Sequence, residues 1–408
     1  MKFHNQLRYA TQIVTTYRGE IPLHVWLKNF FRERKQMGAR DRKLVSSLVY
    51  GFYRLGHAIR DIPAEDRILA GFFLCNDTAH ELLGYFRPEW NVMTGLPLEE
   101  KIAVFRQSNP AFNPADIFPW KDELSEGIDH DAFCLSFLRQ PDLFLRVRPG
   151  YLDAVRKKLE QPSYTFIPPF TIRLPNGFKV EELFTPDKEV VIQDYSSQRI
   201  APFLQRSFDA PDASGMGSSG GGRAPLSVWD ACAASGGKSI LAYDLNPRIR
   251  LTVSDIRESI LHNLRQRFRQ AGITDYHSFV ADLAGGKGKT DAGKGRTPGG
   301  KSGDFDLIIV DAPCSGSGTW SRTPEELYFF HPDKIRSFSD LQKKIVTQTN
   351  ARLAAEAALL YITCSVFKKE NEEIAAFIAA SGLKPDLVEN IIGYDVKADS
   401  MFAARFIC

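Results

Sequence analysis

The sequence predicts an α/β protein: a Rossmann-like, doubly wound domain with a mostly parallel sheet, preceded by an all-helical domain and a small α+β connector. Three patterns predict this order. Apolar residues first repeat at helical spacing, then alternate at a period of two, and from residue 188 short apolar strands alternate with helices. We therefore expect domains at 1–138, 139–187 and 188–408.

The N-terminal domain is predicted from an amphipathic helical pattern. Five apolar residues fall at positions i, i+3, i+4, i+7 and i+8 of one helix face: Leu23, Trp26, Leu27, Phe30 and Phe31. Residues 1–60 hold twelve Lys or Arg against three acids, whereas residues 61–140 hold six against fourteen. The basic surplus favours an RNA-binding face, and a solvated helical surface is the alternative that charge alone leaves open.

The period changes in the connector and again in the catalytic domain. Strands are expected at 144–147 and 170–174, with a helix at 151–159 between them. Later strands are expected at 226–230, 250–255, 277–281, 306–311 and 358–363, and helices at 238–245, 259–271, 334–357 and 371–380. Such alternation implies a parallel sheet with helices on both faces.

Two segments interrupt this alternation, at 210–225 and 284–303. The first is rich in Gly and Ser and the second in Gly and Lys, so neither can bury enough apolar surface to order itself. We expect both to be flexible surface insertions.

Composition narrows the class of protein. With 408 residues, 43% apolar and 25% charged, the chain is long enough for two or three domains and typical of a soluble protein. No run approaches the roughly 18 apolar residues of a membrane span, and the N-terminus lacks the apolar core of a signal peptide. The six cysteines are scattered without a CxxC pair, so we expect no metal site and no disulfide. We expect a cytoplasmic monomer without a membrane partner.

The stretch DACAASGGKS at 230–239 ends like a phosphate-binding loop. Gly237, Lys238 and Ser239 fit the end of that template, but Cys232 stands at its first glycine. The strand also ends in an acid, Asp230, which would face any triphosphate in the loop. A nucleotide hydrolase is therefore disfavoured, and a turn that approaches another kind of nucleoside is favoured.

Acids at the strand ends indicate which nucleoside this is. Asp255 ends the strand after Asp230, where a carboxylate accepts hydrogen bonds from ribose hydroxyls in this architecture. Asp282 follows the third strand and can reach an adenine amino group. Three acids suit the cationic S-adenosylmethionine better than a pyrophosphate, although each can instead cap the following helix. The turn residues expected to bind the cofactor are Cys232, Ala233, Ala234, Ser235, Gly236, Gly237 and Lys238.

Two cysteines follow neighbouring strands and suggest the chemistry. Cys314 lies in DAPCSGSG, directly after the fourth strand, and Cys364 lies in YITCS after the fifth. Ligand-binding residues gather at this edge of a doubly wound sheet. A buried structural cysteine would not need Pro313 before it, glycines after it and a second copy on the next strand.

These motifs resemble those of the Sun/RsmB-type RNA 5-methylcytosine methyltransferases. DACAASGGKS is similar to the first motif of that family, DAPCSGSG to the fourth and YITCSVFKKENEEI to the sixth. QDYSS at 193–197, MFAAR at 401–405 and FLRV at 144–147 match further segments, and RDR at 40–42 with LVYG at 48–51 resembles a NusB-type helical domain. The likeness spans nearly the whole chain.

The chain departs from the family pattern at three points. Ser235 stands where proline is usual, Arg148 stands where asparagine commonly follows Arg-Val, and the stretch at 353–358 lacks the usual Gly-Gly turn. None of these departures removes a catalytic position.

The resemblance implies S-adenosylmethionine-dependent methylation of cytosine C5 in RNA through a covalent adduct. Cys364 would attack C6, Cys314 would assist loss of the C5 proton and release of the enzyme, and Asp311 would hydrogen-bond the base near the methionine end of the cofactor. The target would be a loop or flipped nucleotide, because a stacked base hides C5 and C6. Arg146 or Arg148 is expected to contact the RNA backbone.

Ribosomal RNA is favoured over transfer RNA as the partner, because the N-terminal likeness is to the ribosomal enzymes. A transfer-RNA cytosine-C5 methyltransferase is the nearest alternative. A catalytically silent RNA-binding assembly factor is disfavoured because both cysteines and the cofactor acids are retained. Uracil C5 methylation can use the same covalent logic, and the paired cysteines favour cytosine over it.

Overall fold

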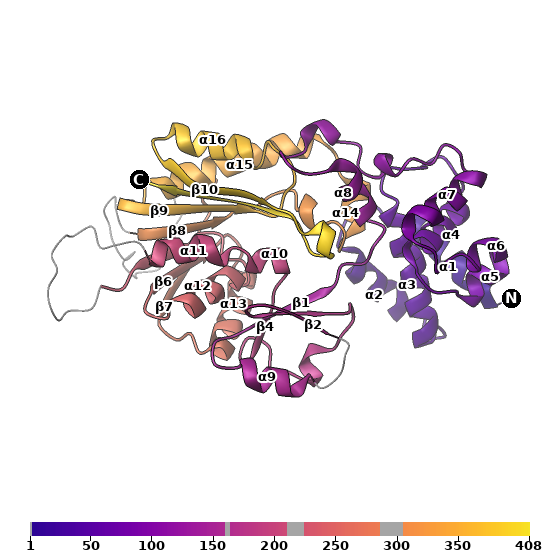
Figure 1. Ribbon diagram of the computed structural model, residues 1–408, viewed down its shortest axis with the longest axis horizontal. Coiled ribbons are helices and arrows are strands. Elements are labelled where there is room, and N and C mark those ends of the chain that lie inside the picture. Colours follow the sequence, from indigo (N-terminus) through magenta and orange to yellow (C-terminus); the bar gives the residue numbers. More distant parts are fainter. Residues whose placement is uncertain (1, 160–163, 210–223, 286–304) are drawn as a thin grey trace. The chain divides into compact units, whose positions relative to one another are not determined.

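The computed structural model describes residues 2–159, 164–209, 224–285 and 305–408 (Figure 1). The insertions predicted at 210–225 and 284–303 lie almost entirely outside the described residues. No described helix is long and apolar enough to cross a membrane.

Packing divides the chain into two compact units. The helical unit comprises Met1–Leu124, Ile128–Pro141 and Thr319–Pro332, and the sheet unit comprises Ser125–Gly127, Asp142–Gly318 and Asp333–Cys408. The three-domain division at 138 and 187 and the likeness of the helical part to NusB stay predictions.

The helical unit contains α-helices from two separate parts of the chain. They are α1 (Lys2–Thr16), α2 (Leu23–Arg32), α3 (Ala39–Arg54), α4 (Ala64–Cys75), α5 (Glu81–Phe86), α6 (Pro88–Asn91), α7 (Leu98–Ser108), α8 (His130–Ser136) and α14 (Pro324–Phe329). The apolar stripe predicted for the second helix is present, since α2 buries Leu23, Leu27, Phe30 and Phe31. The segment Thr319–Pro332 packs within this unit through Trp320, which is 1% exposed, and Glu325, which accepts a hydrogen bond from Leu23 N–H at 3.1 Å.

A small antiparallel sheet begins the sheet unit. Its strand order is β2-β3-β1-β4, with β1 (Leu143–Val147), β2 (Thr165–Ile167), β3 (Thr171–Leu174) and β4 (Val190–Ile192). The helix α9 (Leu152–Lys158) buries Val155 against one face, and the short helices α10 (Tyr195–Gln198) and α11 (Ala201–Phe208) follow β4.

The large sheet has seven strands in the order β10-β11-β9-β8-β5-β6-β7. These strands are β5 (Ser227–Asp230), β6 (Arg250–Asp255), β7 (Tyr276–Val280), β8 (Phe305–Asp311), β9 (Leu353–Thr363), β10 (Lys384–Ile391) and β11 (Met401–Ile407). β5 to β9 pair in parallel, and β10 and β11 join as antiparallel strands. The predicted Rossmann-like α/β class is therefore confirmed.

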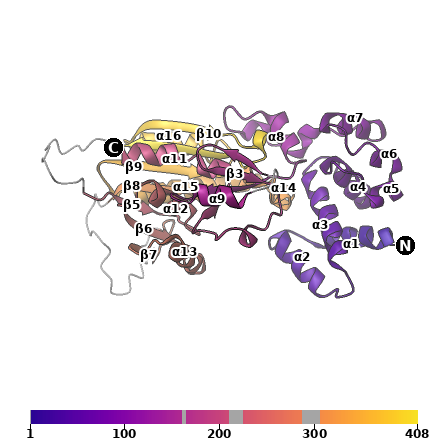
Figure 2. The ribbon, with the colours of Figure 1, turned by 60° about the horizontal axis from the view of Figure 1, so that its bottom comes forward.

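Helices cover both faces of this sheet because successive strand residues point to opposite sides. Val228 packs with α11, α12 (Gly237–Leu245) and α13 (Glu258–Ala271), whereas its neighbour Trp229 packs with α15 (Asp333–Asn350) and α16 (Glu372–Ala380). Figure 1 shows the two layers on opposite sides of the strands, and Figure 2 shows α13 along β6 and β7.

One sequence prediction of secondary structure is wrong. A helix was expected at 334–357, but α15 ends at Asn350 and β9 already begins at Leu353. Leu353 pairs with Phe305 of β8, and Ala358 pairs with both Leu307 and Ile407. Pairing in the middle of the sheet outweighs the helix preference of the alanine-rich stretch, because propensity is the weaker effect.

Candidate active site

The candidate site lies where the parallel strands end. Asp230, Asp255 and Asp311 are the last residues of β5, β6 and β8. The strand order reverses between β5 and β8, and ligands of doubly wound sheets bind outside the carboxyl ends of the strands at such a point.

The structure brings the two predicted cysteines together. The sulfurs of Cys314 and Cys364 lie 3.3 Å apart, although 50 residues separate them in the chain. We call residues 312–318 and 364–371 the cysteine loops. Gly318 N–H donates to Cys364 O at 2.9 Å and so fixes one loop directly on the other.

The environment of Cys314 favours its protonated form. The hydrogen bond to Cys364, burial, and the charges of Cys364 and Glu370 raise the pKa of the Cys314 thiol well above its ordinary value. Either sulfur can donate in this pair, and the raised pKa of Cys314 favours Cys314 S–H as the donor.

Lys238 and Asp311 form an ion pair next to the cysteines. Lys238, the second residue of α12, places Nζ 2.7 Å from Asp311 Oδ2. Burial disfavours the charged form of Lys238, but Asp311 and Cys364 outweigh it, so the pKa of its ammonium is raised. The site therefore holds a cation that acts on Cys364 and a carboxylate at the end of β8.

The turn between β5 and α12, here called the cofactor loop (residues 231–236), is held by its own backbone. Ala233 N–H donates to Ser254 O at 2.9 Å, and Ala234 N–H donates to Asp255 Oδ2 at 3.1 Å. Ala234 and Gly236 take positive φ values of 47° and 86°. A Cβ on Gly236 would also meet Phe268 at 2.6 Å, which explains why this position needs glycine.

One arginine fastens the cofactor loop from outside. Arg267 of α13 donates through Nη1 to Ser235 O and Oγ, both at 3.0 Å. The same guanidinium makes a bidentate pair with Asp187, at 2.7 and 2.9 Å. The hydroxyl of Ser235, where the family commonly has proline, is thus used in a contact that proline cannot make.

A cavity of about 420 Å³ opens beside the cofactor loop, within the usual size range of ligand sites. It is lined by Ala231, Cys232, Asp255, Ile256, Arg257, Ala281, Asp282, Leu283, Ala284, Pro313, Cys314, Leu341 and Ile345. Burial raises the pKa of the Cys232 thiol, so this third cysteine lines the cavity as an unreactive thiol. Three of the predicted cofactor residues, Cys232, Asp255 and Asp282, thus line one cavity with Cys314. The other predicted cofactor residues do not line it: Ala233, Ala234, Ser235, Gly236, Gly237, Lys238 and Asp311.

The residues around the cavity fit S-adenosylmethionine. Apolar side chains line it together with the carboxylates of Asp255 and Asp282 and the guanidinium of Arg257, which pairs with Asp255 at 3.1 Å. Asp255 and Asp282 also accept hydrogen bonds from the backbone that follows them, at Arg257 N–H and Ala284 N–H. Both acids therefore cap the backbone that follows them, and this role is compatible with binding the cofactor.

Asp230 differs from the other strand-end acids because it is fully buried. Its Oδ2 accepts from Ser239 Oγ at 2.6 Å, and Oδ1 has no hydrogen-bond partner in the structure. Burial raises the pKa of the Asp230 carboxyl to about 7, and the nearby Asp311 adds to the effect. Asp230 therefore stabilises the start of α12 through its hydrogen bond with Ser239 and does not line the cavity.

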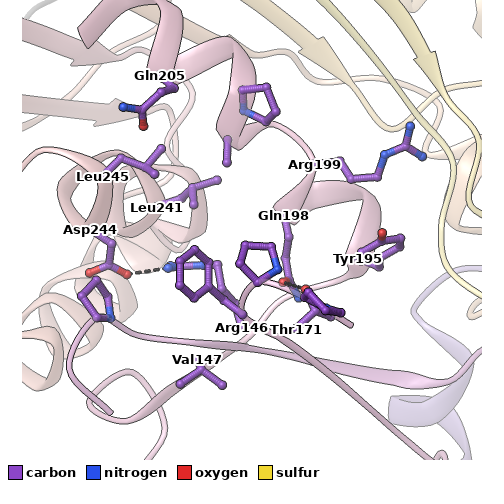
Figure 3. A pocket seen from close by; sticks show the side chains of 16 residues that line it. Arg146, Val147, Thr171, Tyr195, Gln198, Arg199, Gln205, Leu241, Asp244 and Leu245 are labelled. Atoms are coloured by element: carbon purple, nitrogen blue, oxygen red, sulfur yellow. Dashed lines mark hydrogen bonds and ion pairs between the residues drawn. The ribbon is translucent and has the colours of Figure 1, made fainter. Parts of the chain in front are cut away.

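The prediction that Arg146 or Arg148 contacts the RNA backbone is wrong. Both are buried and bind the carboxylate of Asp244 on α12, at 2.5 and 2.7 Å. Figure 3 shows Arg146 pointing toward Asp244 at a second cavity, of about 600 Å³, between the small sheet and α10 to α12. A guanidinium engaged in a buried pair is not available to a phosphate, and these arginines instead join the small sheet to the large one.

Sequence reasoning missed the residues that hold the cysteine loops. Glu370 and Gln342 are fully buried, and both are hydrogen-bonded to the Cys314 loop. Glu370 stands in the run KKENEE, which is typical of a solvated turn, and Gln342 lies in a polar helix. Only their burial in the fold distinguishes them from surface residues.

Among the residues that the structure describes, no group of three His, Cys, Asp or Glu side chains could hold a metal ion.

Comparison with known proteins gives the family. Residues 225–389 match the family model described as 16S rRNA methyltransferase RsmB/F. The chain is 26% identical over 377 residues to the ribosomal RNA small subunit methyltransferase B of an Enterobacter species, covering 88% of this chain and 78% of that protein. For the protein of the same name from Xanthomonas campestris the values are 28% over 374 residues, 88% and 75%.

Solved structures show the same fold. The structure of PH0851 aligns over 97% of this chain and 96% of its own, with a TM-score of 0.64 at 16% identity. A methyltransferase homologue from Pyrococcus horikoshii aligns over 70% of this chain and 92% of its own, with a TM-score of 0.51 at 19% identity. S-adenosylmethionine is therefore the cofactor, and residues 225–389 match the RsmB/F family of methyltransferases.

Proposed function

We propose that this protein methylates C5 of cytosine in RNA, with ribosomal RNA the substrate in preference to transfer RNA. The observation that carries the proposal is the 3.3 Å separation of the Cys314 and Cys364 sulfurs at the ends of neighbouring strands, beside the cofactor cavity. The relatives named as small-subunit ribosomal RNA methyltransferases support the choice of RNA.

The proposed mechanism begins with the cofactor site. Asp255, Asp282 and the backbone of the cofactor loop hold S-adenosylmethionine, which supplies an electrophilic methyl group on a sulfonium. The carboxylates complement that positive charge. Pro313 and Cys314 border the same cavity, so a cytosine ring held beside the cysteines would lie next to the bound cofactor.

Covalent catalysis is needed because cytosine C5 is a poor nucleophile. The Cys364 thiolate forms a bond to C6, and the displaced electron pair makes C5 an enamine carbon that accepts the methyl group. Cys314 S–H gives its proton to ring N3 as the adduct forms, and the resulting thiolate then takes the C5 proton. The electron pair of that C–H bond restores the C5–C6 double bond as the C6–sulfur bond breaks, and the proton on N3 is lost to solvent. Asp311, held by Lys238, hydrogen-bonds the ring or its exocyclic amine and so fixes the base.

Trapping the adduct tests the proposal. RNA containing 5-fluorocytidine blocks the last step, because fluorine cannot leave C5 as a proton does. Incubated with S-adenosylmethionine, the wild-type protein should give a denaturation-resistant protein–RNA adduct, and Cys364→Ala should give none. The absence of an adduct with wild type, or an equal one with Cys364→Ala, would contradict the mechanism.

The second cysteine has a different expected phenotype. Cys314→Ala should accumulate adduct on ordinary RNA, because attack and methyl transfer proceed while release is impaired. Rapid turnover by this variant would refute the role in release. Mapping the methylated nucleotide in ribosomal and transfer RNA then identifies the substrate, and a methylated uridine would refute the choice of cytosine.

A further inference from the structure

Glu370 is a buried carboxylate that joins the two cysteine loops. It follows Cys364 by six residues and is 0% exposed. Its backbone N–H donates to Phe367 O at 3.0 Å, which turns the chain back so that the side chain points at the loop of Cys314. A carboxylate without solvent is costly unless several donors satisfy it.

Three neutral donors do so, and they come from both loops and from α15. Glu370 Oε2 accepts from Ser315 N–H at 2.8 Å and from Gln342 Nε2 at 3.3 Å, and Oε1 accepts from Ser365 Oγ at 3.0 Å. Ser315 directly follows Cys314, and Ser365 directly follows Cys364. One carboxylate therefore holds the residue next to each sulfur.

The same residues form a closed hydroxyl cluster. Ser315 Oγ and Ser317 Oγ each lie 3.2 Å from Ser365 Oγ, and Gln342 Nε2 donates to Pro313 O at 3.0 Å. Backbone N–H groups of Val366 and Phe367 donate to Ser317 Oγ and Ser365 Oγ. Removing the carboxylate would leave several buried donors without an acceptor, so the loops would have to rearrange.

The charges on the two sides of the sulfur pair are opposite. Lys238, a cation, acts on Cys364, whereas the hydrogen bond to Cys364, burial and the charge of Cys364 raise the pKa of the Cys314 thiol, with a smaller contribution from Glu370. Burial raises the pKa of Glu370 itself, and its hydrogen bonds from Ser315, Ser365 and Gln342 oppose that rise and favour the carboxylate. Another buried acid beside Cys314 is the Tyr361 phenol, whose pKa burial also raises. The field across the pair therefore runs from Lys238 to Glu370.

We propose that Glu370 is a positioning residue of the two-cysteine site: it sets the spacing of the sulfurs, and its negative charge keeps their shared proton on Cys314, so that Cys364 is the nucleophile. This role rests on the proposed function, since it decides which cysteine attacks. One part of the proposal, the effect of the Glu370 charge on the Cys314 thiol, can nevertheless be tested on the free enzyme, without RNA.

Thiol alkylation measures that part directly. The full-length protein is treated with iodoacetamide over a range of pH, and the modified peptides of Cys314 and Cys364 are quantified by mass spectrometry. In wild type Cys314 should react only at high pH, because its thiol is held protonated. Glu370→Gln removes a negative charge beside it, so the alkylation midpoint of Cys314 should move to lower pH. Glu373→Gln, an exposed glutamate in the first turn of α16, is the matched control and should change neither midpoint.

Activity then measures positioning. Glu370→Gln should lower kcat by about a hundredfold, because reacting groups misplaced by about 1 Å lose that much rate, while the Kd for S-adenosylmethionine stays unchanged. Glu370→Asp keeps the charge on a shorter stem, so it should restore the Cys314 midpoint but only part of kcat. A purely structural role predicts a lower melting temperature in both variants without a shift of the midpoint.

The outcomes separate the two proposals. An unchanged Cys314 midpoint in folded Glu370→Gln overturns the role of Glu370, whatever the substrate is. A shifted midpoint in a protein that forms no adduct with 5-fluorocytidine RNA keeps the charge effect and refutes the methylation chemistry. If Glu370→Gln does not fold, Glu370→Asp and Ser365→Ala replace it, and wild-type kcat in both would overturn the positioning role.

Discussion

The cysteine loops are fastened by buried side chains, whereas the cofactor loop is fastened by its own backbone and by one arginine. Glu370, Ser365 and Gln342 hold the cysteine loops from within the core. The cofactor loop is instead hydrogen-bonded to Asp255 and Arg267, and it borders the cofactor cavity. From this difference we infer that the positions of the two sulfurs are fixed before any substrate binds. The cofactor loop, in contrast, is fully packed only when the cofactor is bound. Substitutions in the first region should therefore cost stability, and those in the second should cost affinity.

The largest effect is expected at Gly318 in the cysteine loops. A Cβ there would overlap Ser400 O and meet Cys364 O at 3.0 Å, so Gly318→Ala must push apart the backbone segments to which Gly318 is hydrogen-bonded on both sides. We expect a loss of about 3 kcal/mol in the free energy of unfolding. Urea denaturation measures it. A loss below 1 kcal/mol would show that the cysteine loops tolerate an added side chain as easily as the cofactor loop does.

The next effect depends on pH and concerns Asp230, which lies beneath both regions. Below pH 3.8 both the folded and the unfolded chain hold the proton, and between 3.8 and about 7 only the folded chain holds it. The wild type therefore loses stability as pH rises through this window, and Asp230→Asn does not. We expect the stability of the variant relative to wild type to grow by about 2 kcal/mol between pH 5 and pH 8. Asp275→Asn, at an exposed position, should show no such change.

A smaller effect is expected at Arg267, the outer support of the cofactor loop. Arg267→Gln removes the hydrogen bonds to Ser235 and to Asp187, so the free cofactor loop is less ordered. Part of the free energy of cofactor binding is then spent on ordering the loop. We expect the Kd for S-adenosylmethionine to rise about fivefold, near 1 kcal/mol, with kcat at saturating cofactor little changed. Isothermal titration calorimetry measures the Kd. Arg265→Gln, on the same helix and paired only on the surface with Glu258, is the control. Equal effects in both variants would refute the support by Arg267.

The smallest change in stability is expected at Gly237, the counterpart of Gly318 in the second region. An added Cβ meets nothing there, so Gly237→Ala should leave the free energy of unfolding within about 0.5 kcal/mol of wild type. Gly237 is one of the turn residues expected to bind the cofactor, so the affinity for S-adenosylmethionine should fall. A stable variant with unchanged affinity would place the cofactor away from this backbone.

Much of the framework was predictable from local sequence, because apolar runs ending in an acid define the parallel strands. β6 begins and ends where predicted, at Arg250 and Asp255, and the two cysteines lie at the expected edge. Long-range pairing was not predictable: β9 extends into an alanine-rich stretch that favours a helix by propensity. The two antiparallel strands complete the sheet, and of these only β11 contains a segment, residues 401–405, that the family resemblance singled out.

The supports of the site were harder to predict, because burial decides the role of a charged residue. Glu370 and Arg146 have no local pattern that separates them from solvated charges. Glu370 proves to be a core acceptor and Arg146 a buried partner of Asp244. In both cases the partner lies far along the chain, at Ser315 or Asp244, so the sequence near the residue carries no signal.

The path of Thr319–Pro332 has a practical consequence for dissecting this enzyme. The chain leaves the cysteine loop, contributes Trp320, Leu327 and Phe330 to the helical unit, and returns to the sheet unit at Asp333. A fragment that starts at Asp142 would keep these three apolar side chains but lose the helices that bury them. Contiguous exposed apolar surface of this kind promotes aggregation. Studying the two units apart therefore calls for co-expressing residues 1–141 with the remainder, or for replacing Thr319–Pro332 by a short polar linker.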